Sequence, residues 1–371
     1  MEPVRQLSRQ PTPRPGILEI SPYVGGESTA EAADNRLGRL IRLASNEGAF
    51  GPGPKAAAAY LAQADNLHRY PDGGSTALRR ALAARYGLDA DRIVCGAGSD
   101  EIISLLVRSY VGPGDEVVYS AHGFLMYPLS AKAAGAIPVA APERDLRTDV
   151  DAMLAAVTER TKLVFIANPN NPTGSYLSAG EMERLHAGLP PNVILVIDAA
   201  YAEYMNRNDY ADGSALVDRF DNVVMTRTFS KIHGLGSLRL GWGYCPAGIA
   251  DVLNRVRGPF NVSAAAQAAG LAALEDMAFV DRSRAHNEAC RERTAEALRA
   301  LGLTVHPSVA NFLLVDFGGR DAEAARLHLK RHGVLVRQMG AYGLPGCLRV
   351  SIGQDAEMDV LVELLSGHLG G

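Results

Sequence analysis

The 371-residue chain lacks the features that mark several large classes of protein. Its four cysteines lie far apart and form no CxxC pair, so the sequence predicts neither a disulfide framework nor a metal site. No apolar run approaches the ~20 residues that span a bilayer, and residues 1–15 are polar and proline-rich, unlike a secretory signal. We therefore expect a cytoplasmic protein with no membrane partner.

A large excess of charge of one sign is also missing. There are 37 basic and 41 acidic residues, and this balance gives no support for a nucleic-acid partner held by bulk charge. Lysine is scarce, because five of the basic residues supply all the side-chain amines of the chain. If the chemistry needs an amine, the candidates are Lys55, Lys132, Lys162, Lys231 and Lys330.

The common catalytic motifs are absent as well. The chain contains no GxxxxGK[ST], HExxH, GxSxG or HxE…CxxC pattern. Two glycine-rich segments, starting at Gly96 and Gly234, begin like a dinucleotide-binding fingerprint but lack its third glycine. These absences weigh against P-loop enzymes, zinc and serine hydrolases and nicotinamide enzymes.

What is present is an alternation of short apolar runs and amphipathic stretches between residues 75 and 226. Strands are expected at 92–95, 116–120, 137–140, 163–167, 193–197 and 222–226. This pattern is typical of an α/β fold with a mostly parallel sheet covered by helices. After residue 259, a long helical stretch over 264–301 and later short strands indicate a smaller α+β domain. The predicted division is an arm with part of the small domain at 1–45, a large domain at 46–258 and a small domain at 259–371.

Polar residues follow several of the expected strands, at the edge where open α/β sheets bind ligands. In 95–101, Ser99 could cap a helix whose free N–H groups bind an anion, or the segment could be a simple capping turn. The segment 168–174 presents asparagine amides on a backbone fixed by two prolines. Asp198 ends an apolar strand and needs a partner there, which a protonated pyridine nitrogen would supply; the alternative is a helix-capping aspartate.

The segment 228–241 places one amine among hydroxyls and glycines. If Lys231 is desolvated there, its pKa falls and it can form a Schiff base. Ser230 and Arg239 could bind a phosphate beside it. The other four lysines have polar or loop settings that are typical of the surface.

Taken together, these features are those that pyridoxal 5′-phosphate requires, and the chain resembles the fold-type I aminotransferases of class I and II. Within that group it is most similar to the histidinol-phosphate aminotransferases. The resemblance extends from residue 43 to residue 353. Its most specific blocks are 68–73, 98–101, 168–174, 198–201, 230–231 with Arg239, and 342–345 before Arg349. It implies a homodimer with active sites at the subunit interface.

The resemblance also implies roles for residues around the cofactor. Lys231 would hold it covalently and then move the proton, Asp198 would pair with the ring nitrogen, and Phe124 would stack on the ring. Asn171 and Tyr201 would bond the phenolic oxygen. The phosphate would be surrounded by Ser99, Asp100 through its backbone N–H, Ser230, Arg239 and, from the partner subunit, Tyr70.

For the substrates, the resemblance implies that Arg349 binds a carboxylate or a phosphate and that Arg337 adds a second cation. Tyr23, Tyr70 and Asn171 would complete the substrate site. The implied reaction converts L-histidinol phosphate and 2-oxoglutarate to imidazole-acetol phosphate and L-glutamate. An aromatic amino-acid aminotransferase and a threonine-phosphate decarboxylase share the scaffold and remain alternatives. A cofactor-sensing regulator would need a DNA-binding domain for which the first 42 residues are too short.

Overall fold

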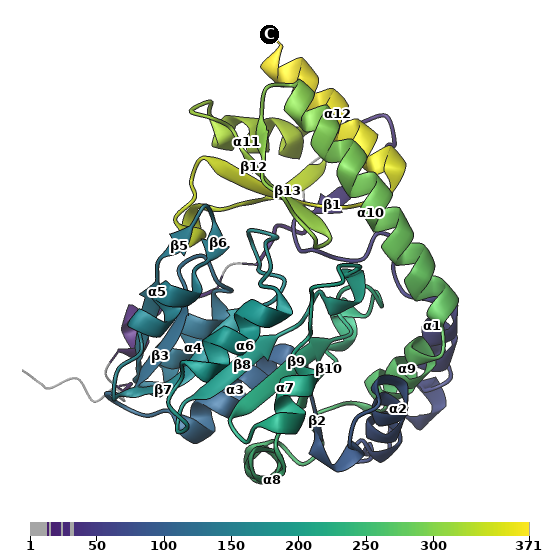
Figure 1. Cartoon of the computed structure of the whole chain (residues 1–371). Helices are drawn as coiled ribbons and strands as arrows, with labels where there is room; N and C mark the ends of the chain where they lie inside the picture. The colour runs from purple at the N-terminus through teal and green to yellow at the C-terminus, as the bar shows by residue number, and fades with distance from the viewer. Residues whose placement is uncertain (1–12, 15, 24, 30–32, 371) are drawn as a thin grey trace, which may run out of the picture.

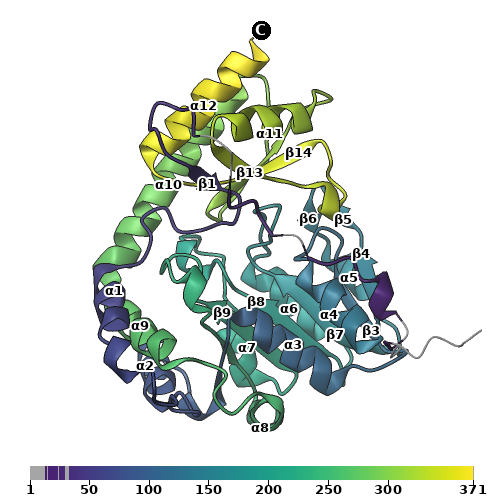
Figure 2. The same ribbon diagram turned by 180° about the vertical axis from the view of Figure 1, so that it is seen from behind.

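The computed structural model describes residues 13–14, 16–23, 25–29 and 33–370, and Figures 1 and 2 show it from opposite sides. A seven-stranded sheet in the order β2-β10-β9-β8-β7-β3-β4 forms the lower part of Figure 1. Because β10 runs antiparallel to both of its neighbours, the other six strands all point the same way. The expected mostly parallel sheet is confirmed. Its strands are β2 (Ile93–Gly96), β3 (Glu116–Ser120), β4 (Ile137–Ala141), β7 (Thr161–Ala167), β8 (Ile194–Asp198), β9 (Val223–Thr228) and β10 (Gly241–Tyr244).

Helices cover both faces of this sheet, which explains why its strands read as continuous apolar runs. One face packs against α3 (Ser99–Tyr110), α4 (Met126–Ala134) and α8 (Ala247–Val256). The other face packs against α5 (Val150–Ala155), α6 (Ala179–Ala187) and α7 (Ser214–Arg219), with α1 (Pro54–Leu61), α2 (Thr76–Tyr86) and α9 (Ala264–Leu274). Within the described residues, no helix is both long and apolar enough to cross a bilayer.

A second, five-stranded sheet lies above the first in Figure 1. Its order is β1-β13-β14-β12-β11, and β1 pairs in parallel with β13, as the view from behind in Figure 2 also shows. The strands are β1 (Ile41–Leu43), β11 (Thr304–Val305), β12 (Phe312–Asp316), β13 (Val334–Gln338) and β14 (Cys347–Ser351). One face packs against α10 (Met277–Ala300), α11 (Ala322–Arg331) and α12 (Asp355–Leu369). The other face meets the large domain, near the hairpin of β5 (Glu143–Arg144) and β6 (Arg147–Thr148).

The stretch expected to be one long helix over 264–301 is two helices. Helix α9 ends at Leu274, and α10 begins at Met277 and rises along the side of the molecule toward the small domain in Figure 1. Helix α9 carries Ala266, Ala269 and Ala273 into the core of the large sheet, so that core extends past residue 258. The domain boundary at residue 258 stays a prediction. The hydrophobic core of the large domain includes residues of α9, which lie beyond that boundary.

The parallel strands bring their carboxyl ends to one edge of the large sheet, below the small domain. Chain segments that follow β2, β3, β7, β8 and β9 meet at this edge. The same edge carries the polar residues singled out by the sequence pattern, as expected for open α/β sheets.

Candidate active site

A pocket at this edge brings together nine of the residues that the sequence analysis selected. It is lined by Ser99, Asp100, Phe124, Ala167, Pro169, Asn171, Asp198, Ala200, Tyr201, Thr228, Ser230, Lys231 and Arg239. These residues come from five different strand-end segments, so no short stretch of sequence contains the site. Tyr23, Tyr70, Arg337 and Arg349 do not belong to this lining.

Lys231 follows β9 in the loop that leads to Arg239. Its amine Nζ donates a hydrogen bond to the backbone oxygen of Ser45 at 3.3 Å and lies 5.7 Å from the centre of the Tyr201 ring. Burial disfavours the charged ammonium, and the nearby Arg349 guanidinium adds repulsion, so the pKa of Lys231 falls from 10.5 to about 8. A much larger fraction of this amine is therefore neutral and nucleophilic near neutral pH than for an exposed lysine.

The other lysines lie away from the pocket. Lys55 donates to the backbone oxygen of Glu275, Lys162 lies 3.8 Å from Asp115, and Lys330 forms an ion pair with Glu27 at 3.0 Å. Lys132 is on the exposed side of α4. The prediction that these amines have surface settings agrees with these contacts.

Asp198 is buried at the last position of β8, with 5 % of its surface exposed. Its carboxylate accepts hydrogen bonds from the Tyr127 hydroxyl at 2.9 Å and the Thr226 hydroxyl at 3.1 Å. Burial raises the pKa of Asp198 to about 6, because these two neutral donors compensate only part of the lost hydration. A cation bound beside it would complete the site. The alternative of a helix-capping aspartate does not hold, since Asp198 ends a strand and its side chain bonds Tyr127 and Thr226.

Sequence reasoning missed both of these donors. Tyr127 is fully buried on α4, and its ring stacks on Phe165 at a centroid distance of 4.6 Å. Thr226 lies on β9, opposite Asp198 in the register of the sheet. A signal existed only for Thr226, because a threonine that follows three apolar residues in a buried strand needs a polar partner.

An anion site forms where α3 begins. The helix starts at Ser99 itself and is preceded by Gly98, so the expectation that the Ser99 side chain caps the helix is wrong. Gly98 has a φ of +88°, and a Cβ there would overlap the Arg239 guanidinium. The close approach leaves the first N–H groups of α3 beside a guanidinium, and both attract an anion.

Arg239 is held in place by three polar contacts. Its guanidinium donates to the Ser230 hydroxyl at 3.3 Å, to the Gly236 backbone oxygen at 3.0 Å and to the Asp100 carboxylate at 3.1 Å. Its φ of +52° is a conformation that side-chain-bearing residues seldom adopt. The Asp100 carboxylate therefore orients Arg239, a role that differs from the backbone N–H contact expected from the sequence.

Asn171 and Tyr201 lie on the side of the pocket that faces the small domain. The Tyr201 hydroxyl accepts a hydrogen bond from Asn46 Nδ2 at 2.8 Å, and Asn171 Oδ1 accepts one from Arg349. Burial raises the pKa of Tyr201 to about 12, so it is a neutral hydrogen-bond donor. Asn46 is not among the residues that the sequence analysis selected, because its contact with Tyr201 depends on the fold. Phe124 meets Tyr127 edge to face at 5.8 Å, at the pocket wall.

Two arginines lie side by side above the pocket. Arg337 on β13 is the register partner of Arg349 on β14, and both side chains are buried. Arg349 donates to the Ala44 backbone oxygen at 2.8 Å, while its Nε has no hydrogen-bond partner among the described residues. Like charges on facing strand positions destabilise a sheet, so a bound anion between them would be favoured.

The two remaining predicted residues are tyrosines that the single chain leaves open to solvent. Tyr23 is 47 % exposed, and its ring centre lies 5.6 Å from the Arg337 guanidinium. Tyr70 is 83 % exposed and stacks on Phe260 at 4.7 Å. Tyr23 therefore lies beside the arginine pair, whereas Tyr70 makes no contribution to the pocket within one chain.

The comparisons with known proteins agree with this geometry. The model of the family "aminotransferase class I and II" matches residues 39–365. The histidinol-phosphate aminotransferase of Rhodospirillum centenum is 64 % identical, covering 97 % of this chain and 99 % of the relative, and that of Paramagnetospirillum magneticum is 58 % identical over the same shares. The crystal structure of histidinol-phosphate aminotransferase from Sinorhizobium meliloti in complex with pyridoxal-5′-phosphate superposes with a TM-score of 0.87 at 32 % identity, covering 99 % of both chains. The resemblance inferred from the sequence blocks is thus confirmed: the chain belongs to the class I and II aminotransferases.

Proposed function

We propose that this protein is a pyridoxal-phosphate-dependent aminotransferase that converts L-histidinol phosphate and 2-oxoglutarate to imidazole-acetol phosphate and L-glutamate, in histidine biosynthesis. Support comes from the relatives at 58–64 % identity, which carry the name of this activity over nearly the whole chain. The observation that carries the proposal is the buried pair Arg337 and Arg349. An amino-acid carboxylate needs one arginine, whereas a phosphate dianion is matched by two.

The residues of the pocket fit pyridoxal 5′-phosphate at three separate points. The start of α3 with Arg239 and Ser230 suits the phosphate, since donors and positive charge converge there. Asp198 is a buried carboxylate that has no cationic partner among the described residues, and a protonated ring nitrogen would supply one. Phe124 and Ala200 form the walls between these points. Lys231 then offers the amine that binds the cofactor covalently.

The remaining steps follow from what these side chains do. When bound, the cofactor supplies an electron sink for the substrate carbon that loses its proton. Lys231 serves as the base and acid for that proton, because a pKa of about 8 lies close to the working pH of an enzyme. Asp198 would pair with the ring nitrogen of the cofactor and favour its protonated form, and Tyr127 and Thr226 hold the Asp198 carboxylate in position. Asn171 and Tyr201 would hydrogen-bond the phenolic oxygen of the cofactor.

Arg349 and Arg337 divide the recognition of substrates. Arg349 lies against Asn171 and so is close enough to serve both substrates, binding the phosphate of one and the carboxylate of the other. Arg337 lies on β13, the strand next to the one that carries Arg349, and its guanidinium is close to the Tyr23 ring. There it adds the second positive charge that a phosphate needs. The alternative, an aromatic amino-acid aminotransferase, would gain little from Arg337.

The experiment compares kcat/KM for histidinol phosphate, phenylalanine and tyrosine in the wild type and in Arg337→Gln. We expect histidinol phosphate to be the preferred substrate. The substitution should lower its kcat/KM by about 10- to 100-fold, since a charge-assisted contact contributes about 1.5–3 kcal/mol. The half-reaction with glutamate should change little. Arg255→Gln, at an exposed arginine of α8, is the matched control. A wild-type preference for the aromatic amino acids would overturn the proposal.

The proposal includes a homodimer in the cytoplasm, in which Tyr70 reaches the phosphate site of the partner subunit. The proposal is supported by a group of exposed apolar side chains that includes Tyr70, because exposed apolar groups are common at protein–protein interfaces. We call it the α1–η2 apolar group, after α1 and the short 3-10 helix η2 (Ala64–Asn66). It consists of Tyr60, Leu61, Leu67, Tyr70 and Phe260.

A further inference from the structure

Three residues with metal-binding side chains meet on the small domain, outside the pocket described above. His306 follows β11, Asp316 is the last residue of β12 and Cys347 is the first residue of β14. These three strands are neighbours in the order β14-β12-β11. The register pairs Asp316 with Cys347, and the backbone N–H of His306 bonds the oxygen of Leu314, two residues before Asp316. Because side chains alternate along a strand, all three project from the same face of the sheet.

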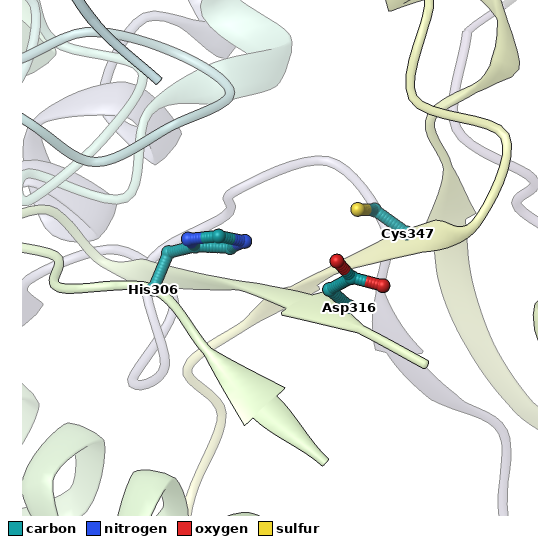
Figure 3. A group of neighbouring side chains, drawn as sticks. All are labelled: His306, Asp316 and Cys347. Carbon is teal, nitrogen blue, oxygen red and sulfur yellow. The ribbon is translucent and has the colours of Figure 1, made fainter. Parts of the chain in front are cut away.

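The ligand atoms of the three side chains lie within 4.8 Å of one another. Figure 3 shows the imidazole ring of His306 directed toward Asp316 and Cys347. Zinc bonds of about 2.0–2.3 Å in a tetrahedral arrangement put ligand atoms about 3.3–3.8 Å apart. Small rotations of the His306 and Cys347 side chains suffice to close this difference, and the backbone positions are already set by the sheet.

The surroundings favour a bound cation over free side chains. The Nε2 atom of His306 is buried and has no hydrogen-bond partner among the described residues, a costly state for a polar atom. Leu314 on the same face of the sheet and Tyr342 on the short 3-10 helix η6 (Gly340–Tyr342) form an apolar cluster with Cys347. His306 also lines an open cavity of about 520 Å³.

We propose that His306, Asp316 and Cys347 bind one zinc ion on the small domain. A nitrogen, a carboxylate oxygen and a sulfur are ligands that zinc accepts, and a water molecule can take the fourth position of such a site. On binding, the S–H bond of Cys347 breaks, the S–Zn bond forms and the proton passes to solvent. The expectation of no metal, drawn from the spacing of the cysteines, did not consider a site with a single cysteine.

The place of this site gives it a structural consequence. Zinc would tie the segment after β11 to β14, the strand that carries Arg349 two residues beyond Cys347. On its other side, the segment contacts the active-site loop, because Val309 donates a backbone hydrogen bond to Gly174 at 3.0 Å. A ligand that binds only the folded state stabilises it, so zinc should raise the melting temperature of the protein.

The test uses the full chain with its cofactor, freed of metal by a chelator and dialysed. Zinc is then added in competition with a chromogenic chelator, and bound zinc per chain is measured. We expect one zinc per wild-type chain and a rise in melting temperature, and neither in Cys347→Ser or His306→Ala. With Co²⁺ as the probe, the wild type should show a thiolate-to-cobalt absorption band that Cys347→Ser lacks.

Cys245→Ala is the matched control, because Cys245 is a buried cysteine in the core of the large domain. It should bind zinc and cobalt as the wild type does. Asp316→Asn serves as a third ligand variant and keeps the shape of the side chain; it should weaken zinc binding at least tenfold. The proposal is overturned if the wild type binds no zinc at one equivalent, or if Cys347→Ser and His306→Ala bind it as tightly as the wild type.

Discussion

At the scale of single residues, Lys231 differs from the other described lysines because its amine is buried and has lost contact with water. Its pKa of about 8, lowered from 10.5 by burial, predicts the pH dependence of cofactor capture. Only the neutral amine attacks a carbonyl, so in the cofactor-free protein the rate of covalent capture should rise with pH and level off above about 8. Stopped-flow absorbance between about pH 6.5 and about pH 9.5 measures this profile.

The matched control is Lys132→Ala, which removes an amine from the surface of α4 and should leave the profile unchanged. Lys231→Ala should abolish covalent capture at every pH. A wild-type rate that increases only on approach to pH 10.5, the value of an exposed lysine, would contradict the assignment.

The sequence allowed more to be predicted about the pocket residues than about the residues that support them. Asp198 could be selected because a polar residue at the end of an apolar strand has few structural explanations. Lys231 and Arg239 could be selected because the 228–241 segment places one amine and one guanidinium among hydroxyls and glycines. Tyr127 could not, since an aromatic residue on an amphipathic helix is expected in the core, and its hydroxyl contact with Asp198 depends on how α4 packs. Asn46 likewise meets Tyr201 only through the path of the chain between the two sheets.

At the scale of elements, the turn between β2 and α3 shapes the anion site. Gly98 has a φ of +88°, and a Cβ added to it would overlap the Arg239 guanidinium. Gly114 has the same φ, but a Cβ added to it would have no other heavy atom within 4 Å. Gly98→Ala and Gly114→Ala both place a side chain at a positive φ, which costs about 1–2 kcal/mol in the left-handed helical region. The cost at Gly98 should be larger, because its ψ of 166° puts it in a region that is essentially restricted to glycine. Gly98→Ala should in addition displace Arg239 and raise the dissociation constant of the cofactor at least tenfold.

Equilibrium unfolding and cofactor titration separate the two effects. Gly114→Ala should lose stability while binding the cofactor as tightly as the wild type. Equal cofactor affinities in Gly98→Ala and Gly114→Ala would show that the close approach of Gly98 and Arg239 does not shape the site.

Element boundaries followed from the sequence where an apolar run ended clearly, as at Glu116–Ser120. The 264–301 stretch is predicted as one helix because it is rich in alanine and contains no proline, so its composition gives no clear sign of the break before α10. Its cause is tertiary: α9 packs into the large core, and α10 turns away toward the small domain. The antiparallel strand β10 was missed because Gly241–Tyr244 is short and carries two glycines.

At the scale of the whole molecule, the α1–η2 apolar group predicts how two chains associate. Leu61 and Leu67 are 70 % and 80 % exposed in one chain. Placing a carboxylate at both positions would bury two charges in a dimer contact, at a cost of several kcal/mol, so Leu61→Glu with Leu67→Glu should yield monomers. Light scattering measures the mass. Leu327→Glu, at an exposed leucine of α11, is the control and should stay dimeric. A double variant that remains dimeric would place the interface elsewhere.

The dimer also predicts which chain supplies Tyr70 to each phosphate site. Lys231→Ala and Tyr70→Ala should each have low activity as pure dimers, assayed at limiting cofactor. In a hybrid dimer of the two, one site has both defects, and the other combines the Lys231 of one chain with the Tyr70 of its partner. If Tyr70 acts across the interface, co-expressed chains carrying two different tags should regain about a quarter of wild-type activity, because half of the dimers are hybrids with one intact site. If Tyr70 instead acted within its own chain, no hybrid would contain an intact site, and mixing would restore nothing.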